Sequence, residues 1–150
     1  MRAVVDSSTW ISLAWSGQLP LLTATPLTPV VLDSVYRETV AEGLARGHAD
    51  AAAIEHAMGA ATRMDDPLGR TVDDRVVAAA AAVGLVVTND LVVGRRANNL
   101  GARWLRTADL VVLAVRSHGI EVTSGHSAIA ALHASGRLTD ALRDAYMQEL

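Results

Sequence analysis

Two aspartates stand where apolar segments of the sequence end. Asp6 follows the apolar residues 3–5, and Asp90 follows the run Leu-Val-Val-Thr-Asn at 85–89. Short β-branched runs of this kind predict buried strands. The carboxyl ends of parallel strands meet at one edge of a sheet, where such proteins bind ligands. We therefore expect both carboxylates at the same edge.

Three further acids fall on predicted helices. Asp73 and Asp74 open a helix predicted over 71–83, and Glu38 lies within a helix predicted over 33–45. Asp73 begins a stripe that continues with apolar residues at 76, 77 and 80, and Glu38 falls one turn after the apolar residue 35. These positions predict that Asp73, in preference to Asp74, and Glu38 face inward.

Each acid also has a purely structural interpretation. Asp73 could cap its helix and interact with the helix dipole. Glu38 could be a solvated surface residue, and Asp90 a turn former. Asp6 could be no more than a polar residue at the start of a helix that Ser7 or Ser8 caps.

A cluster of such carboxylates would have a definite chemistry. Three or four of them within several ångströms repel one another strongly, so the cluster tends to bind protons or cations. Hard oxygen ligands favour Mg²⁺ or Mn²⁺. One or two such ions could orient a water, lower its pKa and offset charge on a phosphate and its leaving oxygen.

Strand and helix patterns alternate along the chain. Strands are predicted at 2–5, 29–32, 85–88 and 103–105, with helices at 8–16, 33–45, 48–61, 71–83, 94–100, 107–117, 124–134 and 139–148. Residues 19–27 and 64–69 are predicted as a loop and a turn. This alternation predicts one α/β domain over 1–150 with a parallel sheet and right-handed crossovers.

The composition excludes several classes of protein. The chain has no cysteine, which rules out disulfides, thiolate metal sites and a cysteine nucleophile and suits a reducing cytoplasm. Nothing in the sequence indicates a membrane segment. All 13 basic residues are arginine, so the lysine of a phosphate-binding loop is missing. The net charge of -3 and the few aromatics give neither a basic footprint nor a base-stacking platform.

The acidic motifs occur in a characteristic order. They are Val-Asp-Ser-Ser at 5–8, Pro29 with Val-Tyr-Arg-Glu at 35–38, Asp-Asp-Arg-Val-Val-Ala at 73–78, and Val-Thr-Asn-Asp at 87–90. Across essentially the whole chain, this order and spacing resemble the PIN domain, a small α/β nuclease domain that includes the VapC-type toxins. Gly-Arg-Arg at 94–96, after the last acid, and the helix ending in His-Gly-Ile at 118–120 look like one bacterial PIN-like branch.

The resemblance implies a fold, a site and an activity. The fold would be a three-layer α/β/α sandwich around a parallel sheet of four or five short strands. The catalytic and metal-binding acids would be Asp6, Glu38, Asp73 and Asp90, with Asp74 as the alternate for Asp73. The protein would be a hydrolase, a Mg²⁺- or Mn²⁺-dependent endoribonuclease acting on RNA, and the toxin of a type II toxin–antitoxin pair. Its partners would be a cognate antitoxin and a second copy of itself in a homodimer.

Other polar residues beside the acids could bind the substrate. Arg95 and Arg96 could hold the phosphodiester backbone by bidentate contacts, or could simply lie at an exposed helix N-terminus. Cations at that end oppose the helix dipole, which favours the functional interpretation. Ser7 and Thr88 fit the role of hydrogen-bond donors rather than nucleophiles, because no predicted histidine–acid pair accompanies them.

A second interpretation is a PIN-like binding or regulatory module with little or no catalysis. Leu91 stands where the resembling branch often has a polar or acidic residue, and residues 106–107 replace a glycine-containing turn. The apolar helix around 110–115 could supply a dimer face or belong to the core. Metal binding through Asp6 and Asp90 distinguishes a nuclease from a bare module.

Overall fold

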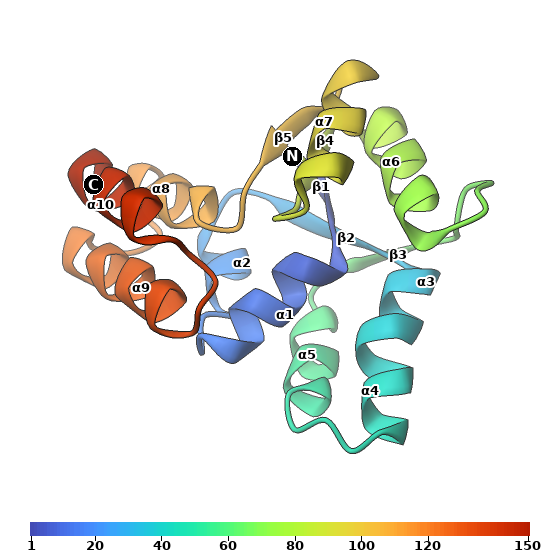
Figure 1. Ribbon diagram of the computed structural model, residues 1–150, viewed down its shortest axis with the longest axis horizontal. Helices are drawn as coiled ribbons and strands as arrows, with labels where there is room; N and C mark the ends of the chain where they lie inside the picture. Colours follow the sequence, from blue (N-terminus) through green and yellow to red (C-terminus); the bar gives the residue numbers. More distant parts are fainter.

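The computed structural model describes residues 1–150 and contains one five-stranded parallel sheet. The strand order is β3-β2-β1-β4-β5, so the first strand occupies the centre (Figure 1). The strands are β1 (Arg2–Val5), β2 (Thr28–Leu32), β3 (Thr62–Met64), β4 (Leu85–Val87) and β5 (Arg103–Leu105).

Helical segments connect the strands and follow the last one. They are α1 (Ser7–Trp15), α2 (Leu21–Ala24), α3 (Asp33–Tyr36), the π-helical turn η1 (Arg37–Ala41), α4 (Glu42–Ala45), α5 (Ala51–Met58), α6 (Val72–Val83), α7 (Leu91–Asn99), α8 (Asp109–Arg116), α9 (Val122–Ala134) and α10 (Asp140–Glu149). No helix combines the length and the hydrophobicity that a membrane-spanning segment needs.

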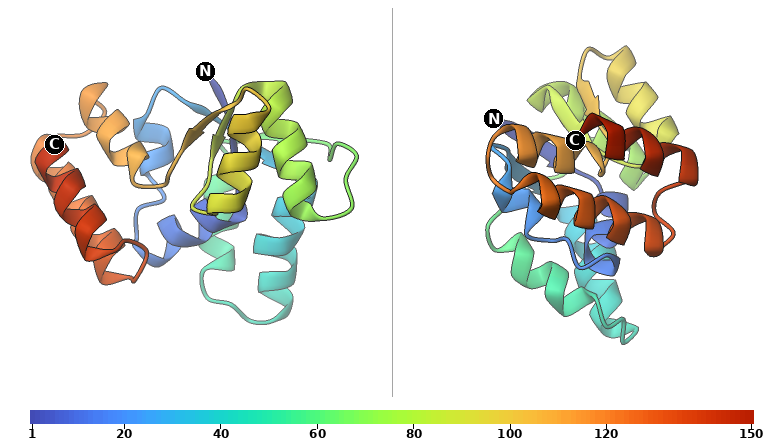
Figure 2. Two further views of the ribbon diagram at one scale, coloured as in Figure 1. Left: turned by 45° about the horizontal axis from the view of Figure 1, so that its top comes forward. Right: turned by 90° about the vertical axis from the view of Figure 1, so that its left-hand side faces the viewer.

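The helices cover the sheet on both faces. Helices α6 and α7 pack together against β1, β4 and β5, while α1 packs with α5 and η1 on the other side (Figure 1). Helices α8 to α10 form a further group at the end of the molecule away from α6 (Figure 2). This arrangement is the predicted α/β sandwich with helices on both sides of a parallel sheet.

The centre of the sheet is completely buried, which explains its uninterrupted apolar sequence. Val4 of β1 lies opposite Val30 on one side and Val86 on the other, and all three side chains are inaccessible to solvent. Strands covered on both faces read as continuous hydrophobic runs. The register brings the carboxyl ends of β1 and β4 together, with Asp6 next to the start of the β4–α7 connection.

Two short elements differ from the sequence prediction. Strand β3 lies between the predicted helix, which ends at 61, and the predicted turn, which begins at 64, where no strand is predicted; α2 lies within the predicted loop. β3 is an edge strand whose Thr-Arg-Met sequence has no apolar run. It forms a strand because its backbone pairs with β2. Its Arg63 is fixed by Asp33 at 2.7 Å and by stacking on Tyr36 at 4.1 Å.

The helical segment after β2 contains a π-turn. Its apolar and hydroxyl side chains at Val35, Thr39 and Val40 are buried, whereas Glu38 is only partly covered and largely exposed. The prediction that Glu38 faces inward with residue 35 is therefore wrong. The wider η1 turn shifts the phase of the helix by one residue, and π-turns of this kind occur frequently at functional sites.

Candidate functional site

Asp6 lies at the carboxyl end of β1 and forms the N-cap of α1. Its Oδ1 accepts a hydrogen bond from the Ser7 backbone N–H at 2.8 Å, and its Oδ2 accepts one from the Thr88 hydroxyl at 2.7 Å and one from the Ser8 hydroxyl at 3.4 Å. The side chain is only 5% exposed. Asp6, rather than Ser7 or Ser8 as predicted, caps this helix.

The surroundings of Asp6 disfavour its charge. Burial is the main cause that raises the pKa of its carboxyl above the usual range. The hydrogen bonds from Thr88 and Ser7 act against this rise, while the negative charges of Asp73 and Asp90 add to it. Asp6 is therefore a buried acid whose charged neighbours are other acids.

Asp90 occupies the equivalent position after β4 and caps α7. Its Oδ1 accepts hydrogen bonds from the backbone N–H groups of Val92 at 2.9 Å and Val93 at 3.1 Å. Its own N–H donates to the Thr88 hydroxyl at 3.0 Å. The second carboxylate oxygen receives no hydrogen bond from the protein. Thr88, which is fully buried, thus bridges the two strand-end acids.

Close packing of α7 against β5 supports Thr88. The Trp104 indole N–H donates to the Thr88 carbonyl at 3.0 Å. The indole lies over Gly94 of α7, where a Cβ atom would stand 2.1 Å from the ring. Gly94, the first residue of the Gly-Arg-Arg motif, therefore makes room for the side chain that holds this strand end.

A buried polar network continues from Thr88 to the start of α8. The Asn89 side chain donates to the Ser12 hydroxyl at 3.1 Å and accepts from the Thr107 N–H at 3.1 Å, and the Thr9 and Thr107 hydroxyls lie 2.9 Å apart. The sequence interpretation missed Asn89 as a positioning residue, although it directly precedes an acid. The network ties together the segments that carry Asp6 and Asp90.

Glu38 reaches the same region from η1. Its Oε2 accepts a hydrogen bond from the Ser7 hydroxyl at 3.2 Å. Partial burial raises the pKa of the Glu38 carboxyl; the Ser7 hydrogen bond opposes the rise, and the charges of Asp6 and Asp73 reinforce it. Ser7 therefore joins Asp6, through its backbone, to Glu38, through its hydroxyl.

The adjacent Asp73 and Asp74 have different surroundings. Asp73 lines a cleft of about 560 Å³ that Glu38 also lines, and its carboxylate receives no hydrogen bond from the protein. Asp74 points to α7 and pairs with Arg96 at 2.9 Å, a contact that lowers the pKa of the Asp74 carboxyl. The structure thus brings Asp73 to the other acids and engages Asp74 elsewhere.

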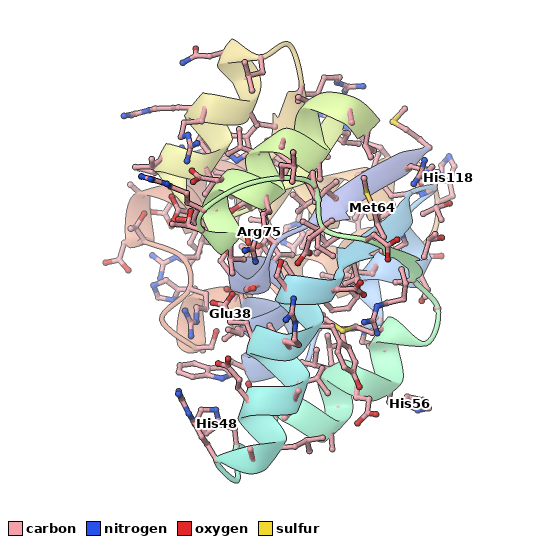
Figure 3. The ribbon with its side chains drawn as sticks, turned by 90° about the vertical axis from the view of Figure 1, so that its right-hand side faces the viewer. Glu38, His48, His56, Met64, Arg75 and His118 are labelled. Carbon is pink, nitrogen blue, oxygen red and sulfur yellow. The ribbon has the colours of Figure 1, made fainter.

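Two arginines that the sequence interpretation missed also line this cleft. Arg37 and Arg75 both pair with Asp66, at 3.2 Å and 3.7 Å. Figure 3 shows Arg75 and Glu38 on facing elements, one at the start of α6 and the other on the helical segment after β2. No sequence signal indicates these arginines, because Asp66 brings them together from distant segments.

The predicted placement of Arg95 and Arg96 at a helix N-terminus is wrong. Because Asp90 caps the helix, α7 begins at Leu91 rather than at Gly94. Arg96 falls in the last turn, where a cation is favourable, and pairs with Asp74. Arg95 is exposed on the same helix and makes no ion pair.

The donor atoms of the four acids fit a divalent cation, but the distances between the acids are too long to hold one. No three carboxylate or imidazole groups of the chain stand close enough together to hold a metal ion. The donor set is nevertheless entirely oxygen, and after burial the charges of neighbouring acids help to raise the pKa of Asp6 and that of Glu38. Asp73 and one oxygen of Asp90 are free of protein hydrogen bonds. These features fit a hard cation such as Mg²⁺ or Mn²⁺.

Comparisons with known proteins bear on the fold. No family model and no curated protein matches the sequence. Among solved structures, the chain is similar to a PilT N-terminus domain protein from the hyperthermophilic archaeon Sulfolobus solfataricus P2, with a TM-score of 0.53 and 14% identity. The match covers 81% of this chain and 95% of that one. The five-stranded parallel sheet, flanked by helices and carrying acids at its carboxyl edge, is therefore the fold of a PilT N-terminus (PIN) domain.

Proposed function

We propose that this protein is a metal-dependent endoribonuclease that hydrolyses RNA phosphodiester bonds. One observation carries the proposal. Asp6, Glu38, Asp73 and Asp90 come from four separate elements and lie near one another. Beside burial, the charges of Asp73 and Asp90 raise the pKa of Asp6, those of Asp6 and Asp73 raise the pKa of Glu38, and no arginine is among the causes at either carboxyl. A fold gains no stability from such repulsion, so the arrangement supports a role in binding a cation.

The residues around the acids have complementary roles. Asp6, Asp73 and Asp90, with Glu38, would hold Mg²⁺ or Mn²⁺. When bound, the ion would supply an activated water and offset charge on the phosphate. Thr88 holds the carboxylate of Asp6 and the backbone of Asp90 in place.

Arginines would bind the substrate, and Ser7 would position one of the acids. Arg37 and Arg75, with Arg95 on α7, would contact the backbone of the RNA. Asp66 holds Arg37 and Arg75 at the cleft. Ser7 orients Glu38 because its hydroxyl donates a hydrogen bond to that carboxylate.

A cleavage assay on structured RNAs with and without Mn²⁺ tests the proposal. Asp6→Asn and Asp90→Asn are each expected to lower the metal-dependent rate by at least about a hundredfold, since even groups outside the first ligand shell contribute tenfold or more. Asp144→Asn, at an exposed position on α10, is the matched control and should cleave at the wild-type rate. Equal rates in all four proteins would overturn the mechanism.

A second candidate function is a PIN-fold binding module that does not cleave. The spacing of the acids favours it, since no three of them stand at metal-holding distance. Calorimetric titration with Mn²⁺ separates the two functions. The nuclease should bind the ion and lose binding in Asp6→Asn, whereas the module should release no heat in either protein.

The biological role we propose is the toxin of a toxin–antitoxin pair. Expression of the wild-type chain should arrest growth, expression of Asp6→Asn should not, and co-expression of a neighbouring small reading frame should restore growth. Growth unaffected by the wild-type chain would contradict this role.

Any homodimer must use a surface other than the main apolar face of α8, because Leu110, Val111 and Ala114 are fully buried in the chain's own core.

A further inference from the structure

A second cavity borders the acidic residues on the side of α7 and the C-terminal helices. It has a volume of about 490 Å³ and is lined by Asn89 and Leu91, the two residues that flank Asp90. Its remaining walls come from the β5–α8 junction, from α9 and α10 and from the segment between them; the helices α8 to α10 form one group in Figure 2. The cavity shares no lining residue with the cleft of Glu38 and Asp73.

Two unpaired arginines line this cavity. Arg106 and Arg137 form no ion pair and no side-chain hydrogen bond, in contrast to the arginines that Asp66 holds at the cleft. Arg137 stacks on Trp15 at 4.1 Å, and its Nε is buried without an acceptor. A buried donor left without an acceptor is destabilising. An anionic oxygen that bound this guanidinium would supply the acceptor that the chain itself lacks.

The rest of the lining is largely apolar. Leu132, Leu138 and Leu142 contribute to its walls, and Arg106 is held near the Trp104 ring at 5.4 Å. A ligand that suits this lining carries negative charge at one end and a flat, mainly apolar body at the other. A nucleotide has both, and its size matches cavities of a few hundred Å³.

We infer that this cavity binds one nucleotide of a single-stranded RNA, adjacent to the bond that is cut. Arg106 and Arg137 contact its phosphate, and its base lies against the leucines or the guanidinium planes. The position next to the cut rests on the proposed nuclease function, because Asn89 and Leu91 place the cavity directly beside Asp90. Occupation by RNA itself rests on the unpaired arginines and the apolar walls.

Binding measured without cleavage tests this inference. A fluorescent single-stranded oligoribonucleotide is titrated into the Asp6→Asn protein in EDTA, and affinity is followed by anisotropy at several salt concentrations. Arg106→Gln and Arg137→Gln in that background should each weaken binding about tenfold, the loss expected for a charge-assisted hydrogen bond. Each should also reduce the slope of log K against log salt by about 0.7.

Arg103→Gln is the matched control. Arg103 is exposed and also makes no ion pair, but it begins β5 at the amino edge of the sheet. Its substitution should leave affinity unchanged. Circular dichroism verifies that each variant is folded. Equal losses in all three variants would indicate nonspecific attraction, and no loss in Arg106→Gln and Arg137→Gln would mean that RNA does not enter the cavity; either result overturns the inference.

Further ligands identify the occupant. Adenosine monophosphate should bind weakly with the same dependence on Arg137, which supports a nucleotide site over a general phosphate site. An acidic peptide that binds in an Arg137-dependent manner where RNA does not would overturn the inference in favour of a protein partner. RNA binding that depends on both arginines, found together with a wild-type chain that cleaves nothing, would support this site while refuting the nuclease function.

Discussion

Asp6 and Asp66 have nearly the same hydrogen bonds but opposite electrostatic surroundings. Asp66 accepts from the backbone N–H of Ser34 at 3.0 Å and from its hydroxyl at 2.9 Å, as Asp6 accepts from a backbone N–H and neighbouring hydroxyls. Asp66 then adds ion pairs with Arg37 and Arg75, whereas the charged neighbours of Asp6 are carboxylates.

The pKa values follow this difference. Burial acts to raise the pKa of both carboxyls. At Asp66 the Ser34 hydrogen bonds and the two arginines outweigh burial and lower the pKa, while at Asp6 the net shift is upward. Hydrogen bonding alone therefore does not decide the charge of a site. Asp66 is paired with two arginines of its own chain, whereas the surroundings of Asp6 provide no cation and disfavour its charged form.

A divalent cation should stabilise the folded protein by binding at Asp6 and not at Asp66. At about one hundred times its dissociation constant, Mn²⁺ is expected to raise the free energy of unfolding of the wild-type protein by about 2.7 kcal/mol. Asp66→Asn should retain this gain, and Asp6→Asn should lose it. Urea denaturation with and without Mn²⁺ measures the difference. An undiminished gain in Asp6→Asn would refute cation binding at this region.

Gly94→Ala should damage the support of the Asp6 region while leaving the Asp66 region intact. A methyl group at this position collides with the Trp104 indole, and overpacking of this kind costs about 1–3 kcal/mol. Urea denaturation measures the loss. In the Trp104→Leu background the same substitution should cost clearly less, and equal costs in the two backgrounds would mean that the two residues are not coupled.

Asp73→Asn and Asp74→Asn extend the comparison to neighbouring residues. Asp73 has no cation partner and lines the same cleft as Glu38, so its substitution should lower metal-dependent cleavage at least about tenfold. Asp74 is already paired with Arg96, and its substitution should change the rate less than about twofold. Single-turnover cleavage rates test the pair, and the reverse order would assign the third acid to Asp74.

Stability should respond to pH in opposite directions at the two aspartates. The raised pKa of Asp6 means that its contribution is complete below the ordinary value of 3.8 and is lost as pH rises through the folded-state value. The lowered pKa of Asp66 means that its contribution is present above 3.8 and is lost as pH falls through the folded-state value.

In metal-free buffer, Asp6→Asn should therefore gain stability relative to wild type as pH rises from about 4 to 7. Asp66→Asn should be less stable than wild type by about 0.5 kcal/mol at pH 7, and the gap should close in acid. Thermal denaturation across this range measures both. Parallel curves for the two variants would show that the arginines do not cause the difference.

The sequence predicts the central features of the fold because they depend on local pattern. Apolar runs that end in Asp6 and Asp90 indicate buried parallel strands, and the order of the motifs indicates the PIN fold. Strand β3 has no such pattern, since pairing with β2 forms it. The orientation of Glu38 depends on a π-turn that helical periodicity does not reveal.

The ion pairs around the acids also cannot be predicted from the sequence. The contrast between Asp73 and Asp74 depends on Arg96, which lies on another helix, and the character of Asp66 depends on arginines from two distant segments. Such ion pairs arise from tertiary packing, so residue type and spacing do not predict them. Neighbouring residues of the same type can therefore differ completely in their role.

The central position of β1 also sets the order in which the protein can become active. Asp6 belongs to the first strand, but its hydroxyl donor Thr88 and its companion Asp90 arrive only when β4 docks beside β1. Pairings between segments so far apart in the chain form slowly. A nascent or partly folded chain thus keeps its acids separated, and the proposed site is assembled only after the middle of the sheet has closed.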